Sequence, residues 1–362
     1  MLYYLYEYLY PLGQEYKILK IFNVFQYVTF RSVMAVLTAL IITFIISPKI
    51  IRYLREKKIG QCIRDDGPKT HLSKSGTPTM GGIIIIIAVF FSSLLWAKPD
   101  NIFLWVCLFS MISFGAIGFI DDYLKLIKKN PKGLAGRYKI LGQFIFSAAI
   151  ISVLYLHLPR TLYFPFFSDP ILDLGIFFIP FGLIVLIGSS NSVNLTDGLD
   201  GLAIGLSLFV IATFGIFAYL TGHKIISDYL KIPFIAGTSE ITVFLAALAG
   251  GGLGFLWYNS HPAEIFMGDT GSLFLGGTLG TTAVILKKEF LLLLVGGIFV
   301  AEALSVMIQV LVYKKTGKRV FKMAPLHHHF ELKGWHESKV IIRFWIIGLM
   351  LSLLGLATLK LQ

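Results

Sequence analysis

Two adjacent carboxylates, Asp121 and Asp122, end an apolar run, and three lysines follow within seven residues. A charged side chain costs roughly 2.5–3.5 kcal/mol at the centre of a membrane helix, so such residues belong at an aqueous edge or in a functional cavity. Adjacent carboxylates also repel each other, and a divalent metal or a shared proton relieves that repulsion. We therefore predict a metal-dependent site at a membrane face around this pair.

A third carboxylate, Asp269, lies in a Gly-Asp-Thr-Gly stretch directly before another apolar run. At such a position an aspartate caps a helix N-terminus or binds a cation, and the glycines permit close approach. The segment 257–270 contains no Lys or Arg, so no cation lies near Asp269 in the sequence. We predict that Asp269 binds Mg²⁺ together with Asp121 or Asp122.

Asp197 and Asp200 stand three residues apart in a polar segment that also contains Asn191 and Asn194. If this segment is the first turn of a helix, both carboxylates point to one face near its positive end. A pair of helix caps is the simpler alternative. The two asparagines add amide groups that suit a nucleobase, sugar or peptide substrate.

Three successive histidines, His327, His328 and His329, form the next cluster. Adjacent positions of a helix point about 100° apart, so all three cannot face one metal from a regular helix. Metal binding, hydrogen bonds to phosphate and a structural role all remain open. The basic residues that precede the cluster favour an anionic partner: Lys314, Lys315, Lys318, Arg319 and Lys322.

The segment from Lys74 to Gly82 contains Thr77, Pro78 and Thr79 and enters an apolar run. Thr, Pro and Gly are ordinary signals for the start of a helix. Lys74 beside such an N-terminus could neutralise a phosphate, with Thr77 or Thr79 donating a hydrogen bond.

The elements that position these residues are membrane helices. The chain is 56% hydrophobic and 14% charged, against about 25% charged in ordinary globular domains. We predict an all-α polytopic membrane protein with a single integral membrane domain, residues 1–362. Runs of about 20 apolar residues give ten spans: 24–46, 80–97, 102–120, 139–158, 174–190, 199–220, 234–256, 271–286, 290–312 and 340–360.

The net charge of +12 is concentrated in the segments between these spans. Alternation of faces puts five segments on one side, and they hold 21 of the 32 Lys and Arg residues: 47–79, 121–139, 190–198, 257–270 and 313–339. By the positive-inside rule this side is cytoplasmic, and both termini then lie outside. No aromatic and basic binding module accompanies the charge, so we predict no nucleic-acid partner.

A membrane transporter is the alternative class of protein. Transporters carry ionisable groups near the middle of the bilayer. Here few ionisable residues interrupt the spans, with Glu240 and Glu302 as the main exceptions, whereas most other carboxylates fall in the cytoplasmic segments or at their margins. We therefore favour an enzyme that works at the cytoplasmic membrane surface.

The sequence resembles the polyprenyl-phosphate N-acetylhexosamine-1-phosphate transferase superfamily, and within it the phospho-N-acetylmuramoyl-pentapeptide transferases. The resemblance rests on five stretches in the family's order, which span most of the chain: Gly76-Thr77-Pro78-Thr79-Met80-Gly81-Gly82, Asp121-Asp122, Asn194 to Leu202, Phe266-Met267-Gly268-Asp269-Thr270-Gly271-Ser272 and Pro325-Leu326-His327-His328-His329-Phe330-Glu331. The last stretch resembles the muramoyl-pentapeptide branch rather than the relatives that use UDP-N-acetylglucosamine, which remain the alternative.

The resemblance implies ten transmembrane helices, a cytoplasmic active site in the bacterial inner membrane, and Mg²⁺. The oligomeric state is left open by the sequence, although exposed apolar spans permit a homodimer. It implies transfer of phospho-MurNAc-pentapeptide from UDP-MurNAc-pentapeptide to undecaprenyl phosphate, which yields lipid I and UMP for peptidoglycan synthesis. An apolar groove among membrane lipids would hold the prenyl tail.

The resemblance also assigns roles to residues. It makes Asp269 the Mg²⁺ ligand and Asp121 the candidate base that keeps the lipid phosphate deprotonated, with Asp122 in support of either role. Either Asp121 or Asp122 could instead serve as a nucleophile that forms an aspartyl-phosphate, and the sequence leaves this choice open. The three histidines contact phosphate or position the substrate. Residues implied for the nucleotide and sugar pocket, in which Phe266 stacks on uracil, are Lys74, Thr79, Lys129, Asn194, Asp197, Asp200, Asn259 and Phe266.

Overall fold

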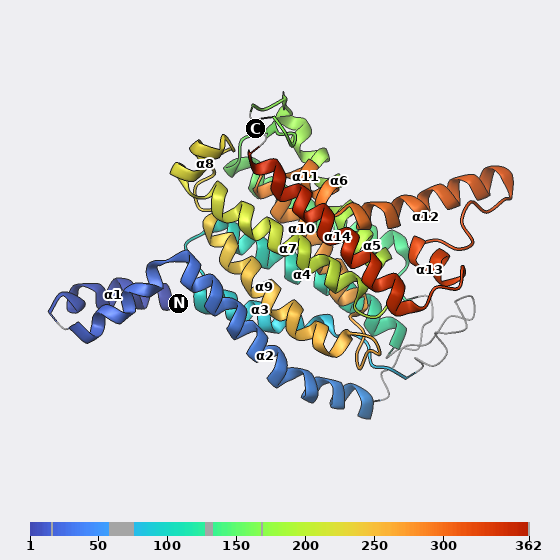
Figure 1. Cartoon of the computed structure of the whole chain (residues 1–362), viewed down its shortest axis with the longest axis horizontal. Helices are drawn as coiled ribbons and strands as arrows, with labels where there is room; N and C mark the ends of the chain where they lie inside the picture. Colours follow the sequence, from blue (N-terminus) through green and yellow to red (C-terminus); the bar gives the residue numbers. More distant parts are fainter. Residues whose placement is uncertain (16, 58–75, 127–132, 168, 361–362) are drawn as a thin grey trace.

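The computed structural model describes residues 1–15, 17–57, 76–126, 133–167 and 169–360. Within them the chain is an all-α bundle, and each of the ten predicted spans coincides with helix (Figure 1). The corresponding helices are α2 (Val28–Glu56), α3 (Gly82–Trp96), α4 (Ile102–Leu126), α5 (Gly136–His157), α6 (Phe178–Thr196), α7 (Leu202–Thr221), α9 (Ser239–Asn259), α10 (Gly268–Ile285), α12 (Gly297–Thr316) and α14 (Glu337–Ala357).

Eight helices of the described chain are long and apolar enough to cross a membrane, which supports the predicted class of protein. The remaining two, α3 and α10, are shorter or less apolar. The other helical elements are α1 (Leu2–Glu15), η1 (Lys17–Gln26), η3 (Gly175–Phe177), α8 (Lys224–Leu230), α11 (Glu289–Val295), α13 (Leu326–Glu331) and η4 (Thr358–Lys360). Strands β1 (Thr161–Leu162) and β2 (Leu172–Asp173) pair antiparallel between α5 and α6.

Helix α10 lies at the centre of the bundle, where every residue from Thr270 to Ile285 is buried. Its low hydropathy reflects many Gly and Thr residues, which suit close packing of helix backbones in a membrane. A Cβ on Gly276 would lie 2.3 Å from the Ser189 carbonyl oxygen of α6, and one on Gly277 would lie 2.6 Å from the Phe114 ring of α4. The composition that weakens the membrane signal of α10 therefore allows α4 and α6 to pack against it.

Several predicted boundaries were wrong, in most cases because helix continues into the polar segments. Helix α2 passes through Pro48 and runs ten residues beyond its predicted end at 46. Helix α4 includes Asp121 and Asp122, which were placed in a loop, and α10 already begins at Gly268. The predicted span 290–312 is two helices, α11 and α12, which meet at Gly296. Apolarity marks only the part of a helix that faces lipid, so it misses the polar turns that build a site.

The two ends of the described chain lie on the same side of the bundle. The Met1 ammonium group donates to the carbonyls of Leu94 and Leu95 at the C-terminal end of α3. The Lys360 ammonium group lies 3.8 Å from the Tyr229 ring centroid in α8, which follows the C-terminal end of α7. Both contacts are at the opposite end of the helices from Asp269. Which side of the membrane this is stays a prediction from the Lys and Arg distribution.

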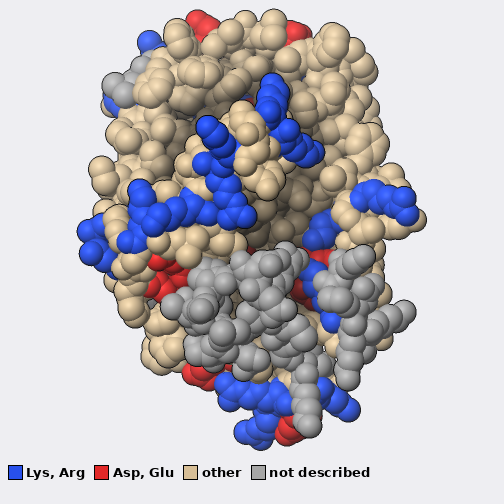
Figure 2. All heavy atoms as spheres, turned by 90° about the vertical axis from the view of Figure 1, so that its right-hand side faces the viewer, with Lys and Arg blue, Asp and Glu red and all other residues tan. Residues whose placement is uncertain are grey.

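Helix α12 leans away from the bundle toward the right of Figure 1. It is the least buried of the eight long apolar helices, with 17% of its most apolar stretch buried. Figure 2 views the structure from that side and shows Lys and Arg side chains around a hollow, with acidic groups beside it. This hollowed face of the molecule therefore carries both basic and acidic side chains.

Candidate active site

The carboxylate of Asp121 is buried in the last turns of α4, with 1% of the side chain exposed. Its Oδ1 accepts a hydrogen bond of 2.6 Å from the Leu134 backbone amide, just before α5. Its Oδ2 accepts from two ammonium groups, Lys125 at 2.6 Å and Lys139 at 3.0 Å. Lys125 is one helical turn after Asp121 and Lys139 is in the first turns of α5. Charged hydrogen bonds from three donors thus keep a carboxylate in this buried position.

Asp122 points in another direction and caps α10. Its Oδ1 accepts from the Asp269 backbone amide at 3.2 Å. Its Oδ2 accepts from the Thr270 amide at 2.9 Å and from the Thr270 hydroxyl at 2.7 Å. The first amides of a helix have no partner within the helix and carry partial positive charge, so a carboxylate satisfies both needs. Asp122 therefore fixes the backbone that carries Asp269.

The close packing of α4 and α10 makes that cap possible. A Cβ on Gly118, one turn before Asp122, would lie 2.1 Å from the Asp269 carbonyl oxygen. Gly268, with φ +73°, turns the chain into α10 in a conformation that side chains disfavour. Glycine is thus required on both sides of this contact.

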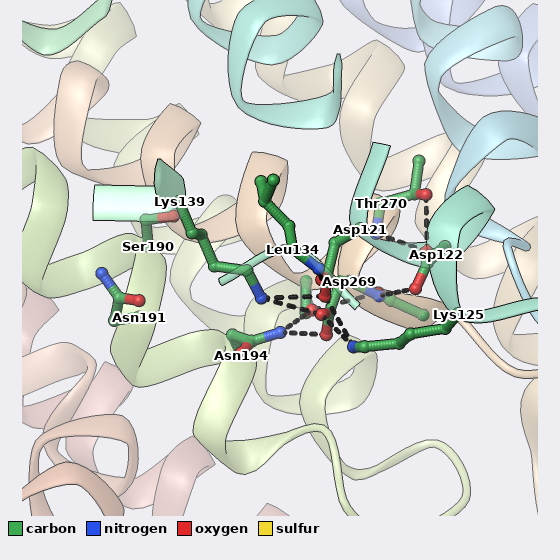
Figure 3. Close-up of polar contacts among 12 residues, drawn as sticks. Asp121, Asp122, Lys125, Leu134, Lys139, Ser190, Asn191, Asn194, Asp269 and Thr270 are labelled. Carbon is green, nitrogen blue, oxygen red and sulfur yellow. Dashed lines mark hydrogen bonds and ion pairs between the residues drawn. The ribbon is translucent and has the colours of Figure 1, made fainter. Parts of the chain in front are cut away.

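The Asp269 side chain joins the Asp121 cluster. Its Oδ2 accepts from Lys125 at 2.8 Å and from Lys139 at 2.9 Å, and its Oδ1 accepts from the Asn194 amide at 2.7 Å. Figure 3 shows these side chains pointing toward Asp269 from separate helices. Asp269 keeps 19% of its side chain exposed, against 1% for Asp121, so it is the more accessible carboxylate.

The structure corrects one step of the sequence reasoning about Asp269. The segment 257–270 does lack basic residues, but the fold supplies two lysines from α4 and α5. Lys125 and Lys139 were not among the predicted site residues. Lys125 did carry a usable signal, because it lies four residues after Asp121 on a helix. Lys139 carried none, because it starts what reads as an ordinary membrane span.

Asn194 and its neighbours form the α6 wall of the site. The Asn194 amide donates to both Asp269 and the Ser272 hydroxyl, the second at 2.8 Å. One turn earlier, the Asn191 amide donates to Gln143 of α5 at 2.8 Å. Both asparagines are helical, because α6 extends to Thr196, whereas the sequence placed them in a loop.

Asp197 and Asp200 are not in the first turn of a helix, which corrects their predicted setting. They lie in the turn between Thr196 at the end of α6 and Leu202 at the start of α7. Burial raises the pKa of Asp197 well above its usual range, and the negative charges of Asp269, Asp122 and Asp200 add to this. Asp200 instead accepts from the Ala263 amide at 3.1 Å and lies 3.2 Å from Nδ1 of His261.

The segment before α3 packs along the segment before α10. Phe266 donates its amide to the Pro78 carbonyl at 2.8 Å, and Gly81 donates to the Phe266 carbonyl at 2.9 Å. This pairing sets Thr79 beside Gly268, where a Cβ on that glycine would lie 2.9 Å from the Thr79 hydroxyl. Thr79 is buried, and the Phe266 side chain is half-buried beside the site.

Asn259 ties two of the site segments together. Its Oδ1 accepts from the Gly201 amide at 3.1 Å, and its Nδ2 donates to the Ile265 carbonyl at 2.8 Å. The side chain is buried, with 3% of the residue exposed. In this structure Asn259 joins the α6–α7 turn to the α9–α10 segment.

The three histidines have different surroundings. His327 is buried and its Nδ1 lies 3.2 Å from Glu302 of α12. His328 is partly buried, with Nδ1 2.9 Å from Glu331. His329 accepts from the Lys322 amide at 3.1 Å, and slight burial together with Lys333 and Lys322 lowers its pKa. Each Nδ1 thus has a different partner, and the roles predicted for the three histidines stay predictions.

Two predicted substrate residues, Lys74 and Lys129, lie outside the described residues. The structure therefore gives no contacts for them, and their roles stay predictions.

An apolar cavity of about 420 Å³ lies between α6, α10, α11 and α12. Ser189 and Ser192 line its α6 side, and Phe299 and Met307 line its α12 side. Ser192 is two residues before Asn194, so the cavity extends along the same helix that forms a wall of the carboxylate site. The carboxylate site and this apolar cavity therefore share one helix, α6, in their walls.

Comparison with known proteins gives matches over most of the chain. Residues 104–287 match the model of glycosyl transferase family 4. Residues 74–86 match phospho-N-acetylmuramoyl-pentapeptide-transferase signature 1. A phospho-N-acetylmuramoyl-pentapeptide-transferase of Thermodesulfovibrio yellowstonii is 54% identical over 364 residues, and one of Citrifermentans bemidjiense is 52% identical over 361 residues. Each match covers 99% of this chain and 100% of the relative.

Proposed function

Since this chain belongs to the phospho-N-acetylmuramoyl-pentapeptide-transferase family, we propose that it transfers phospho-MurNAc-pentapeptide from UDP-MurNAc-pentapeptide to undecaprenyl phosphate. The products are lipid I and UMP, and the reaction takes place at the cytoplasmic face of the bacterial inner membrane. The observation that carries this proposal is the junction of Asp121 and Asp269, whose carboxylates share the ammonium groups of Lys125 and Lys139. It lies where α10 begins.

The reaction exchanges one phosphoanhydride for another. Catalysis of phosphoryl transfer consists mainly of positioning and of stabilising negative charge. Lys125 and Lys139 can leave their carboxylate partners to neutralise substrate phosphates, while Asn194 orients Asp269. Asp121 is our candidate for the proton acceptor of the lipid phosphate, and Asp122 acts on the site through the backbone of α10.

The described residues fit a divalent cation. Four carboxylates gather here, those of Asp121, Asp122, Asp197 and Asp269, whereas only two ammonium groups of described residues contact them. Carboxylate oxygens are the ligands that Mg²⁺ prefers, and it keeps several waters. We propose that Asp269, the most accessible of the paired carboxylates, is its ligand, with Asp121 beside it. When bound there, the metal would supply positive charge that stabilises the negative charge of the substrate phosphates.

The apolar cavity between α6 and α12 supports binding of the prenyl tail. Its lining is almost wholly apolar, and it lies along the helix that carries Asn194. We place the tail of the lipid acceptor between these helices, with its phosphate at the carboxylate site. A soluble acceptor would have no use for such a cavity.

The test measures transfer of label from UDP-MurNAc-pentapeptide into an organic-extractable lipid, with and without Mg²⁺. UDP-N-acetylglucosamine is the competing donor in a parallel reaction. We expect transfer only from the muramoyl donor, loss of transfer with a chelator, and exchange of label with UMP. Absence of transfer and exchange in the presence of undecaprenyl phosphate would refute the proposed function.

A pair of variants tests the site itself. Asp269→Asn should abolish transfer, because it removes the negative charge from the proposed metal ligand. Glu264→Gln is the matched control, since Glu264 is an exposed carboxylate in the same segment and should keep wild-type turnover. Full activity of a folded Asp269→Asn protein would show that the metal assignment is wrong.

A further inference from the structure

The buried carboxylate of Glu302 is outside the carboxylate cluster and has no role in the function proposed above. It lies in α12, in a span, and is fully buried. Its Oε2 accepts from the Leu326 amide at 2.6 Å, and its Oε1 accepts from the His327 amide at 3.2 Å. These amides begin the short helix α13 that carries the three histidines. A buried carboxylate is costly unless hydrogen bonds satisfy it, and here α13 supplies them.

The third contact of Glu302 determines which ring nitrogen of a neutral His327 carries the proton. Nδ1 of the imidazole lies 3.2 Å from Oε1 of Glu302. A carboxylate only accepts, so the proton of the neutral ring must be on Nδ1, and Nε2 keeps a free electron pair. The partner of one ring nitrogen thus selects the state of the other, as it does for histidines in metal sites.

His327 Nε2 is buried and has no hydrogen-bond partner among the described residues. It lies against Gly198, in the turn that contains Asp197. A Cβ on Gly198 would be 2.2 Å from Nε2, and the next nearest atoms belong to the same ring. The backbone of Gly198 is not left-handed, so its conformation does not require glycine. Glycine is needed here because a side chain would collide with the imidazole. The ring nitrogen is therefore pressed against the turn that enters the carboxylate site.

We propose that Glu302 is a positioning residue that holds His327 with its proton on Nδ1, so that the buried ring sets the Asp197–Gly198 turn, and with it Asp197, for the substrate. This inference deepens the proposed function and rests on it. His328 and His329 have other partners, Glu331 and the Lys322 amide, so only the first histidine is held in this way among the described residues.

The first experiment compares turnover of Glu302→Gln, Glu302→Asp and Ser305→Ala in the transferase assay. For histidines in metal sites, removal of the partner that orients the ring typically costs about 10–100-fold in activity, and we take that range as the guide here. We expect such a loss of kcat for Glu302→Gln, with KM for the nucleotide substrate changed less than about threefold. Glu302→Asp keeps the negative charge and should retain more turnover. Ser305 is buried one turn along α12 and bonds only the Glu302 carbonyl, so Ser305→Ala should match wild type.

The second experiment is a double-mutant cycle. If Glu302 acts through His327, adding Glu302→Gln to a His327→Asn protein should cost less than about threefold more. Gly198→Ala should reproduce the loss of kcat, because the added methyl group displaces the ring. Losses that multiply in the double variant, or wild-type kcat in Glu302→Gln, would overturn the proposal.

The third experiment does not depend on turnover. Nitrogen-15 NMR of histidine-labelled wild-type protein, with His327→Asn identifying the signal, reports which ring nitrogen carries the proton. We expect a protonated Nδ1 and a bare Nε2, and a mixture of tautomers in Glu302→Asp. A proton on Nε2 in the neutral wild-type ring would overturn the positioning role even if Glu302→Gln fails to fold. A correct tautomer in a protein without transferase activity would instead refute the proposed function.

Discussion

Asp122→Asn distinguishes a structural cap from a reacting carboxylate. In the native protein Asp122 accepts three hydrogen bonds from the first turn of α10. Asparagine has a single acceptor oxygen, and its NH₂ group would face one of the three donors. Hydrogen bonds to a charged group contribute about 1.5–3 kcal/mol each, and a charge at a helix N-terminus about 0.3–1 kcal/mol, up to about 2 kcal/mol when partly buried. We expect Asp122→Asn to lower the free energy of unfolding by about 2–4 kcal/mol on this basis.

The loss of stability should accompany the loss of turnover, because the cap positions the Asp269 backbone. Thermal melting of purified protein in detergent measures the first, and transfer of label into lipid measures the second. Thr270→Val is the matched control, since it removes only the hydroxyl donor at 2.7 Å and should cost about 1 kcal/mol. If Asp122→Asn melts at the wild-type temperature yet has no activity, Asp122 reacts with the substrate and the capping argument is refuted.

Three other variants test the packing, the charge and the lysines of the site. Gly118→Ala should reduce turnover at least tenfold because its methyl group would displace Asp269, whereas Gly136→Ala, with open space around its Cβ, should be silent in the same assay. The raised pKa of Asp197 means that the folded state binds its proton more tightly than the unfolded state, so wild-type stability falls as pH rises from the unfolded pKa of about 3.9 toward the folded pKa. Asp197→Asn should therefore melt above wild type at pH 8, with the difference disappearing near pH 4; no stabilisation at pH 8 would contradict the burial argument. Lys139→Gln removes a cation that competes with Mg²⁺ for Asp269, so the half-saturating Mg²⁺ concentration should fall. We expect kcat to fall as well. A higher half-saturating Mg²⁺ concentration in this variant would argue against a metal at Asp269.

The sequence by itself determined the class of protein and the set of helices. Ten apolar runs became helices because burial in lipid depends on composition, which can be read locally. The sequence also marked Asp121, Asp269 and Asn194 as reactive groups, since charged and amide side chains at the ends of such runs are costly without a purpose. Motif order then identified the family, which the comparisons confirm.

Only the tertiary structure decided which partners each of these groups contacts. Neighbouring carboxylates separate because adjacent helical positions point about 100° apart, so Asp121 faces the lysines and Asp122 faces the α10 backbone. Lys139 reaches Asp269 across 130 residues, a contact that no local pattern encodes. Glu302 interrupts an apolar span because its carboxylate accepts hydrogen bonds from the first turn of α13. Such pairings depend on which helices pack together, and that is a property of the assembled bundle.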